Sequence, residues 1–546
     1  MHTVRTREQQ ETEATQRRPW GVRARWAVGV LAVAGVLMFC YLRTAGTVPV
    51  LSDGAGNALQ AWDMLHGNLL LNGWWVTDFS LYTTELPQLM LVEAVAGLRP
   101  EVVHICAAMT YTLLVLLAAL VARGRARGAQ GLVRALLAAM IILAPEPEAP
   151  TWILQSSPDH VGTAVPVLLL LALLDWARPR WYVPVIAGLL LAWTIVADPL
   201  MLVVGSGPLA IACLVRVGRS WRPRRGPGGW AGLRAARFEL WLAVAAVAAI
   251  PVALAADRLP RDLGGFSTNK TVSGVVPLSV LPKNVGLVAQ SVLAIFGADW
   301  SAVHGGLNVT FALLHLAGVA LVLAATALAA WRLLRSLAPR RSGGSGDLVA
   351  DVLVIAVVAN VVAYFVAFRI TNIYTAHEIG PVASLGAALA GRVLGGPLLR
   401  ARLVPVLAAG LACYTAMLGF AAARAQTPPQ NVTLEAWLSQ HGLTSGLAPY
   451  WQGTSVTLES GGRIDMVSVV PGAGGRLAPR HWGADMRLAD AATHTANFVV
   501  VAPGGVVTRA EAVASFGQPA SVYQYAGDTI LVWHENLLRH LGPSVG

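Results

Sequence analysis

The sequence predicts an all-α polytopic membrane protein with about eleven transmembrane helices, a structured first external loop and a small exported α/β domain at the C-terminus. Of its 546 residues, 55% are hydrophobic and 13% are charged, and the mean hydropathy is +0.58. A water-soluble core cannot hide this much apolar surface, because soluble domains contain about 25% charged residues. Long apolar runs recur between residues 26 and 422, and clusters of arginine separate every second pair of them.

The N-terminal segment, 1–25, is polar and rich in arginine, and no small-x-small cleavage site follows the apolar run at 26–42. This predicts a cytoplasmic tail and a retained first helix. A bilayer core about 30 Å thick requires about 20 apolar residues per helix, and ten further runs approach this length. They lie near 101–123, 131–145, 161–177, 181–197, 199–216, 238–256, 308–333, 349–368, 380–396 and 403–422.

The arginine clusters predict the topology, because short cytoplasmic loops carry an excess of lysine and arginine. They are "RGRARG" (123–128), "ARPR" (177–180), "RVGRSWRPRRG" (216–226), "RLLRSLAPRR" (332–341) and "RARL" (400–403). Their alternation places the N-terminus in the cytoplasm and the other connections outside. The predicted external segments are 43–100, 146–160, 257–307, 369–379 and the tail from about 424. The net charge of +11 therefore indicates topology and contact with membrane lipids, not nucleic-acid binding.

The chain uses arginine almost to the exclusion of lysine, since Lys270 and Lys283 are its only lysines. Together with abundant alanine, glycine and valine, this indicates the coding bias of a GC-rich bacterial genome. We therefore expect a multi-pass protein of the cell's inner (plasma) membrane.

The tail, 424–546, differs in kind from the apolar runs. The stretches 466–470, 497–502 and 529–533 predict strands, and 509–516 predicts a helix between two of them. A unit of this length can bury a core of its own. We thus expect three parts: a cytoplasmic tail (1–25), a transmembrane domain (26–423) and an extracytoplasmic α/β domain (424–546). The segment 341–347 is rich in glycine and serine and predicts a flexible loop.

The first external loop, 43–100, has a composition that predicts a fold of its own. Its stretch "GAGNALQAWDMLHG" (54–67) places Ala58, Trp62 and Leu65 on one helical face, which predicts an amphipathic helix on the membrane surface. A second apolar helix, too short to span, is predicted at 86–98. We expect the loop to form a lid against the membrane, with Asp63 solvated.

The same loop carries a family resemblance. Asp53 directly follows the first predicted helix, Ala61, Met64 and Gly67 lie near the spacing "A-x-x-L-x-x-G", and an "E-x-P" sequence starts at Glu85. In this arrangement the membrane portion resembles the GT-C glycosyltransferases, which include protein O-mannosyltransferases and aminoarabinose transferases. An exported C-terminal domain also occurs in that class. The chain departs from the family at Asp53, where many members carry two adjacent acidic residues.

The resemblance implies a GT-C-like fold and a membrane glycosyltransferase. Its donor would be a polyprenyl-phosphate sugar, its acceptor a glycan, a lipid or a protein, and the transferred group a hexose or a pentose. Such a transfer needs a general base for the acceptor hydroxyl and groups that stabilise the departing phosphate. Asp53 is the candidate base; the alternative is that it caps a helix, as aspartate before glycine commonly does.

Other external residues are candidates for substrate binding. Glu85 either binds substrate or caps the helix that follows it. Asp159 and His160 lie at the mouth of a helix, where they either contact the acceptor, a metal or the lipid phosphate, or cap the helix. These two residues, with His377 and Glu378, are also candidate ligands for a divalent metal, which takes oxygen and imidazole donors. Their spacing does not by itself require a metal.

The external turn 369–392 resembles the "R-Y-x-x-P" region of the GT-C class, where a basic residue meets the lipid-linked phosphate. Arg369 or His377 would take this role, since guanidinium groups bind phosphate well; the alternative is that Arg369 only reaches the headgroups.

Two other classes of function remain open. Asp198 lies close to a spanning apolar run, where a charge is costly, and it would be an ion or substrate site in a transporter or lipid flippase. The missing second acid would suit a noncatalytic scaffold of the same fold. The sequence contains neither a P-loop nor a G-x-G-x-x-G after a strand, which argues against nucleotide-driven transport.

Overall fold

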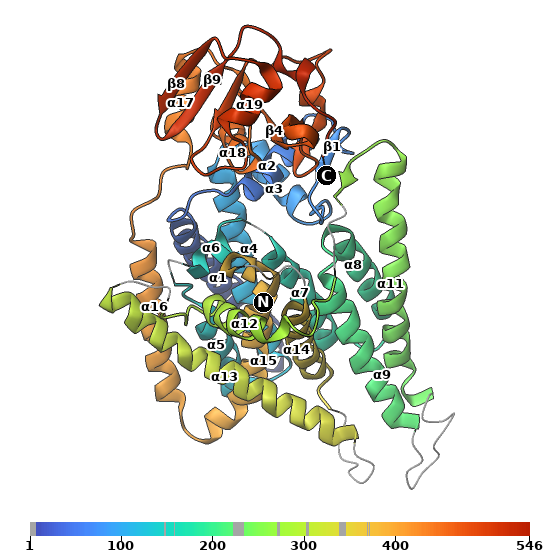
Figure 1. Ribbon diagram of the computed structural model, residues 1–546. Coiled ribbons are helices and arrows are strands. Elements are labelled where there is room, and N and C mark those ends of the chain that lie inside the picture. Colours follow the sequence, from blue (N-terminus) through green and yellow to red (C-terminus); the bar gives the residue numbers. More distant parts are fainter. Residues whose placement is uncertain are drawn as a thin grey trace, which may run out of the picture.

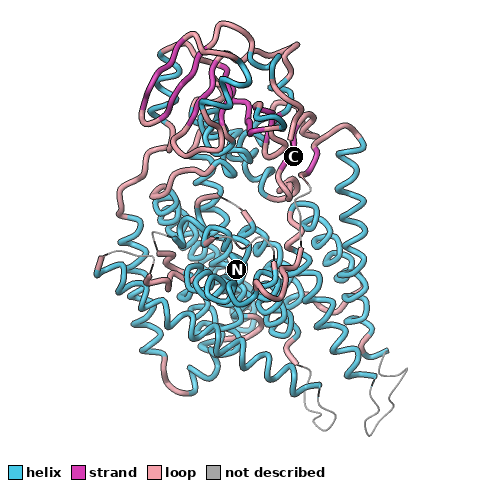
Figure 2. Tube along the Cα trace, in the orientation of Figure 1, coloured by secondary structure: helices cyan, strands magenta, loops and turns pink. Residues whose placement is uncertain are grey.

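The computed structural model describes residues 7–146, 149–157, 159–221, 234–269, 274–301, 305–337, 346–367, 370 and 372–545. A bundle of helices forms the larger part, and a smaller unit of strands and short helices covers one end of it (Figures 1 and 2). The predicted flexible segment 341–347 and the candidate residue Arg369 lie wholly or mostly outside the described residues.

Eight helices in the described part of the chain are long and apolar enough to cross a membrane, so the predicted polytopic helical class is confirmed. They are α1 (Arg7–Ala45, apolar from Ala24), α4 (Glu101–Arg123), π-helical η2 with α9 (Leu202–Ser206 and Gly207–Trp221), α11 (Arg237–Asp262), α13 (Gly306–Leu337), α14 (Leu348–Val366), η3 with α15 (Ile373–Ile379 and Gly380–Arg400) and α16 (Val404–Ala422).

Four shorter apolar helices complete the bundle. They are α5 (Gly128–Ile142), η1 with α7 (His160–Thr163 and Ala164–Trp176), α8 (Tyr182–Ala197) and α12 (Leu281–Ile295). Each of the eleven predicted runs coincides with a helix. The sequence did not indicate α12, which lies within 257–307, because Lys283 and Asn284 interrupt its apolar pattern.

The first loop folds as two helices and a strand, as predicted for its helices: α2 (Ser52–Leu65), β1 (Trp74–Val76) and α3 (Glu85–Ala96). The predicted face of α2 is wrong. Ala58, Ala61 and Met64 are buried, whereas Leu65 is exposed. The reason is that α2 packs between α3 and the helix α18 (Tyr450–Glu459) and does not lie on one flat membrane surface.

The C-terminal unit contains a six-stranded sheet in the order β5-β4-β3-β7-β9-β8. Its strand β3 is parallel to β4 and β7, and the outer pairs are antiparallel. The strands and helix predicted from the sequence are present as β4, β7, β9 and α19. The bounds are α17 (Val432–Gln440), β3 (Ser445–Ala448), β4 (Asp465–Pro471), β5 (Leu477–Pro479), β7 (Phe498–Val501), α19 (Arg509–Phe516), β8 (Ser521–Tyr525) and β9 (Asp528–Val532).

A second, three-stranded sheet joins segments that are far apart in the sequence. Strand β1 of the first loop pairs in parallel with β2 (Ser267–Thr268) and antiparallel with β6 (Ala484–Asp485) of the C-terminal unit. These hydrogen bonds, with the packing of α18 on α2, attach the C-terminal unit to the first loop. The surfaces between these two parts therefore have a defined geometry.

Candidate functional site

Asp53 lies in the first turn of α2, beneath the C-terminal unit. The hydroxyl of Tyr450 donates a 2.7 Å hydrogen bond to its Oδ1, and Ser52 donates one of 2.7 Å to the carbonyl of Trp451. Residue Leu51 occupies the N-cap position of α2, and no side chain caps this helix. The capping alternative for Asp53 is therefore wrong, and its carboxylate instead faces α18.

The position of Asp53 depends on its glycine neighbour. A Cβ on Gly54 would lie 2.8 Å from Val103 Cγ1 and 2.9 Å from Ser157 Cβ, so only glycine allows α2 to approach α4 and the segment before η1 this closely. Burial raises the pKa of Asp53 to about 6, while the hydrogen bond from Tyr450 opposes this rise. A carboxylate with this pKa is mostly ionised at neutral pH. It is also a stronger base than an ordinary aspartate.

Glu85 is the first residue of α3 and is buried. The hydroxyl of Thr84 donates a hydrogen bond to its Oε2, and its Oε1 lies against the backbone of Gly162, where any side chain would collide with it. Burial raises the pKa of Glu85 to about 8, and the charges of Asp198 and Asp159 act in the same direction. Glu85 is therefore mostly protonated at neutral pH.

His160 and Asp198 form a buried pair. Nδ1 of His160 lies 2.8 Å from Oδ2 of Asp198, and Thr163 donates a hydrogen bond to the same oxygen. The amide of Leu200 donates a 2.8 Å hydrogen bond to Oδ1. Burial alone would raise the pKa of Asp198, but His160 and these hydrogen bonds keep it below the usual range. Asp198 therefore positions His160 as a fixed counter-charge.

Asp159 and His377 continue the cluster. Asp159 is the N-cap of η1, where its Oδ1 accepts a 2.7 Å hydrogen bond from the amide of His160. Its Oδ2 lies 3.9 Å from Nδ1 of His377 in η3. The rings of His160 and His377 stack with their centroids 5.5 Å apart, and Phe79 covers His160 at 4.3 Å. The capping alternative is correct for Asp159, which nevertheless has one oxygen directed to His377.

The structure therefore brings five of the predicted residues together from four separate segments. They are Asp53, Glu85, Asp159, His160 and His377, and we call them, with Asp198 and Tyr450, the membrane-end cluster. Glu378 is half-buried and close enough to His160 to interact electrostatically. Its backbone carbonyl accepts a hydrogen bond of 3.1 Å from Asn360.

Sequence reasoning missed two groups from the C-terminal unit. Tyr450 donates a hydrogen bond to Asp53, and Arg480 interacts electrostatically with both Tyr450 and Asp53. The guanidinium of Arg480 lies 5.9 Å from the ring centre of Tyr450, and burial lowers its pKa. No local pattern marks either residue, because only the docking of the C-terminal unit brings them to α2.

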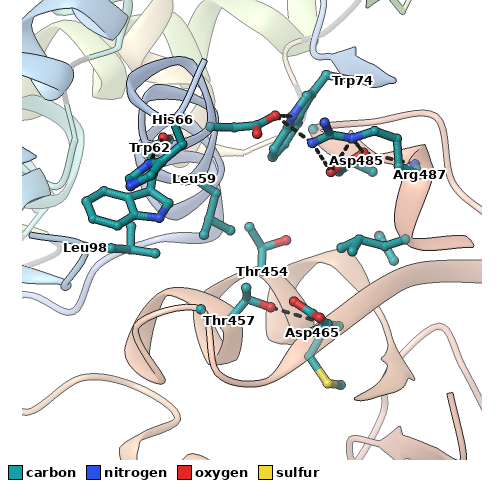
Figure 3. Close-up of a pocket in the computed structure, with 17 residues that line it drawn as sticks. Leu59, Trp62, His66, Trp74, Leu98, Thr454, Thr457, Asp465, Asp485 and Arg487 are labelled. Carbon is teal, nitrogen blue, oxygen red and sulfur yellow. Dashed lines mark hydrogen bonds and ion pairs between the residues drawn. The ribbon is translucent and has the colours of Figure 1, made fainter. Parts of the chain in front are cut away.

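A cavity of about 280 Å³ opens beside the cluster, between α2 and the C-terminal unit (Figure 3). Thr454, one turn along α18 from Tyr450, lines it. Figure 3 shows Trp62, His66 and Trp74 on one side and Thr457 and Asp465 on the other. Its lining therefore combines aromatic rings with hydroxyl and carboxylate groups.

Asp63 lies at the edge of this cavity and is not solvated as expected. Its Oδ2 lies 2.6 Å from the guanidinium of Arg487 and accepts a 2.8 Å hydrogen bond from the indole of Trp74. Arg487 also pairs with Asp485 at 2.6 Å. The ion pairs link α2 to strand β6, and all three residues line the cavity.

The described residues contain no preformed site for the predicted metal ion. Within those ranges, no three histidine, cysteine, aspartate or glutamate side chains are grouped so that they could hold a metal ion. His160 directs its Nδ1 to Asp198, and Asp159 directs one oxygen to the amide of His160. These two candidate ligands therefore already have partners.

No protein-family model matches the chain, and no curated protein matches it in sequence. Solved membrane proteins match the structure over most of this chain. The oligosaccharyltransferase of Archaeoglobus fulgidus, solved with a tethered acceptor peptide, has a TM-score of 0.47 at 14% identity, and the match covers 81% of this chain and 63% of that one. A structure of the same protein with zinc and sulfate has a TM-score of 0.44 at 14% identity, covering 86% and 67%.

ArnT from Cupriavidus metallidurans, solved with undecaprenyl phosphate, matches with a TM-score of 0.43 at 13% identity, covering 95% of this chain and 99% of that one. The chain thus spans nearly the whole of ArnT but less than two thirds of the archaeal oligosaccharyltransferase in its peptide-tethered structure. All these TM-scores lie below 0.5, so the matches do not indicate a function for this chain.

Proposed function

We propose that the protein is a membrane glycosyltransferase that moves one hexose or pentose from a polyprenyl phosphate to a glycan, lipid or protein acceptor. The observation that carries this proposal is the membrane-end cluster itself. Ionisable residues from separate segments face one another at one end of an apolar bundle, and burial shifts the pKa of Asp53 and Glu85. Such shifted groups are typical of sites that transfer protons.

Asp53 is the proposed general base. Its carboxylate accepts the proton of the acceptor hydroxyl while that oxygen bonds to the anomeric carbon and the bond from this carbon to the phosphate oxygen breaks. The polyprenyl phosphate leaves with the bonding electrons, and attack from the opposite face inverts the anomeric centre. A pKa of about 6 suits this role, because a general base works best when its pKa lies near the working pH. Tyr450 donates its hydrogen bond to Oδ1, and Oδ2 is the oxygen that we propose accepts the proton.

Other residues have proposed roles in binding. Arg480 and His377, which interact electrostatically with Asp53, are candidate cations for the departing phosphate. Arg369, which lies outside the described residues, remains a candidate from the sequence alone. Glu85, mostly protonated at neutral pH, is suited to donate a hydrogen bond to a sugar hydroxyl or phosphate oxygen. Asp159, His160 and Glu378 complete the candidate binding surface, and the cavity beside α2 is suited to hold the acceptor, because aromatic walls with a few polar groups are typical of ligand sites.

The topology is part of the proposal. The described arginines of these connections, such as Arg123, Arg219 and Arg335, belong to the helix ends that lie with the ends of α9 and α13, and we place this end in the cytoplasm with the tail 1–25. The domain 424–546 then lies outside the inner (plasma) membrane. Labelling of a single cysteine placed at exposed Ser439 or at exposed Arg335 with a membrane-impermeant reagent tests this, since only the first is expected to react in intact cells.

A transporter or lipid flippase would use Asp198 as an ion site, because this residue is buried next to apolar helices. Its two oxygens, however, already accept hydrogen bonds from Thr163 and Leu200 and contact His160. A carboxylate whose oxygens are engaged in this way positions His160 and has no free oxygen for a transported ion. This observation favours the enzyme over a transporter, and the residual alternative is a noncatalytic scaffold.

The test is transfer of radiolabelled sugar from polyprenyl-phosphate donors to endogenous acceptors in membranes that contain the protein. Asp53→Asn is expected to lower the rate by about 10² to 10⁴ at equal abundance, which is the usual contribution of a general base. The matched control is Glu101→Gln, an exposed carboxylate at the start of α4, which should leave the rate unchanged. Parallel assays with a chelator and with added Mg²⁺, Mn²⁺ or Zn²⁺ test the metal prediction.

The other outcomes are equally informative. Equal labelling by the native protein and Asp53→Asn would remove Asp53 as the base and move that role to Glu85 or Asp159. Absence of labelling with every hexosyl and pentosyl donor would refute the transferase proposal and favour the scaffold or the transporter.

A further inference from the structure

A second cavity lies at the opposite end of the bundle from the membrane-end cluster. Helix α15 leads from η3, which carries His377, to Arg400. Its 21 residues correspond to about 30 Å at 1.5 Å per residue, which is close to the thickness of the hydrocarbon core. The cavity measures about 390 Å³, and its lining includes Arg219 near the end of α9 and Arg332 and Ser336 near the end of α13. These helix ends lie away from the C-terminal unit (Figure 1).

Five arginines from four helices line this cavity. They are Arg134 of α5, Arg219 of α9, Arg332 of α13, and Arg392 and Arg400 of α15. Only two carboxylates, Asp347 and Asp351, line it with them. Asp175, behind the wall, brings the acidic count to three, so the cluster retains two positive charges more than negative ones.

Arg392 forms the floor of the cavity and is fully engaged. Its guanidinium makes a two-point contact with Asp175, at 2.5 and 2.7 Å, and another with Asp347, at 2.5 and 2.8 Å. It also donates a 2.7 Å hydrogen bond to the carbonyl of Val121. Arg392 therefore joins α15 to α4, to α7 and to the start of α14, and the excess charge belongs to the other arginines.

Those other arginines are arranged by depth. Arg134 is half-buried, and its Nε is a buried donor with no hydrogen-bond partner in the described part of the chain. Arg332 and Arg400 are exposed at the mouth. A buried donor without a partner costs free energy that an acceptor oxygen would recover. The arrangement is thus suited to an anion with several acceptor oxygens.

We propose that this cavity binds a phosphate group, carried either by an anionic phospholipid headgroup or by a soluble phosphate. Guanidinium groups bind phosphate oxygens in pairs, and basic pockets between membrane helices at headgroup depth attract anionic lipids. Arg134 binds the phosphate from within the cavity, and Arg332 and Arg400 bind it from the mouth. This site is separate from the proposed sugar-transfer site and does not depend on it.

The experiment uses the full chain purified in detergent. Short-chain phosphatidylglycerol, short-chain phosphatidylcholine and inorganic phosphate are the three probes, with sodium chloride at matched ionic strength as the salt control, and binding is followed by the rise in unfolding temperature and by native mass spectrometry. The test variant is Arg332→Gln/Arg400→Gln. The control variant is Arg123→Gln/Arg335→Gln, which removes two exposed arginines from the same end of the bundle that do not line the cavity.

The native protein and the control are expected to bind phosphatidylglycerol or inorganic phosphate with equal affinity. The test variant should bind about thirtyfold more weakly, since it lacks two arginines that each contribute about 1 kcal/mol near a headgroup, and about 1.4 kcal/mol corresponds to a tenfold change in affinity. Binding of phosphatidylglycerol alone identifies a headgroup site, whereas binding of inorganic phosphate alone identifies a soluble ligand. Arg134→Gln, which leaves the mouth intact, should weaken binding as well.

Three results would overturn the proposal. The first is that neither probe binds, the second is that phosphatidylcholine binds as tightly as phosphatidylglycerol, and the third is that the test and control variants weaken binding equally. Unfolding temperatures of the variants without a probe show whether each is folded, and mass spectrometry of the bound ligand separates binding from stability.

Discussion

The hydroxyl of Tyr450 makes a sharp test of the proposed base, because it donates a hydrogen bond to Asp53 and lowers the pKa that burial raises to about 6. The change Tyr450→Phe removes this one atom and keeps the ring. A hydrogen bond to a charged group contributes about 1.5 to 3 kcal/mol, and one pKa unit corresponds to about 1.4 kcal/mol. The pKa of Asp53 should therefore rise by about 1 to 2 units, to about 7 to 8.

The direction of the pH effect follows from the protonation state that works. A base acts only when it is ionised, so sugar transfer should increase as pH rises through the pKa of Asp53. At pH 7 the ionised fraction falls from about 0.9 in the native protein to between about 0.5 and 0.1 in Tyr450→Phe. The rate at pH 7 should thus fall about two- to tenfold, and the two proteins should become similar near pH 9.

The measurement is the pH profile of sugar transfer from pH 5 to 9 at low donor concentration, where kcat/KM reports the free protein. Tyr523→Phe is the control, since Tyr523 is an exposed tyrosine of the C-terminal unit, and it should leave the acidic limb at about pH 6. An acidic limb that stays in place or moves to lower pH in Tyr450→Phe would refute the assignment of Asp53 as the base. A uniform fall in rate without a shift would indicate a structural role for Tyr450.

Three further predictions concern stability and the contact between the two parts of the chain. Glu85 has a folded pKa of about 8, above its unfolded value, so its contribution to stability is complete below about pH 4.5 and is lost as pH rises to 8. The unfolding temperature of Glu85→Gln should therefore rise relative to that of the native protein as pH increases over this window. Parallel curves of unfolding temperature against pH would contradict the raised pKa. Asp198→Asn leaves His160 buried without its counter-charge and should lower the free energy of unfolding by about 3 kcal/mol, measured against Asp257→Asn, a partly exposed carboxylate of α11. Arg487→Gln breaks the contact with Asp63 and should speed amide hydrogen exchange in β1 and β6 while β9 stays protected; unchanged exchange would show that the strands alone hold the two parts together.

The helices of the bundle were predictable because each needs only a local property. An apolar run of sufficient length has to form a helix in a bilayer, and α4 spans the same residues, 101–123, as its predicted run. The helix α12 was missed because its polar residues Lys283 and Asn284 break the run. Helices of 13 to 16 residues such as α7 and α8 were found by their composition, although they are shorter than a typical span.

Predictions that depend on which surfaces meet were less successful. The sequence placed Leu65 on the packed face of α2, but the C-terminal unit covers a different face, and Leu65 remains exposed. Asp63 was expected to be solvated for the same reason, since its partner Arg487 lies more than four hundred residues further along the chain. Tyr450 and Arg480 could not be assigned at all, because their relevance arises only from docking.

The candidate residues that sequence reasoning did identify share one physical feature. Asp53 and Glu85 begin helices, and Asp159 caps one, so each carboxylate lies near helix amides that favour negative charge. The ends of spanning helices at one side of a membrane necessarily lie at the same depth, and this brings residues from separate connections within reach of one another. A common depth in the membrane does not determine which of these residues are neighbours around the bundle. The close contacts of α2 at Gly54 and of Glu85 at Gly162 determine this. A bulky side chain at Gly162 should therefore displace Glu85 from the cluster, even though no ionisable group is changed.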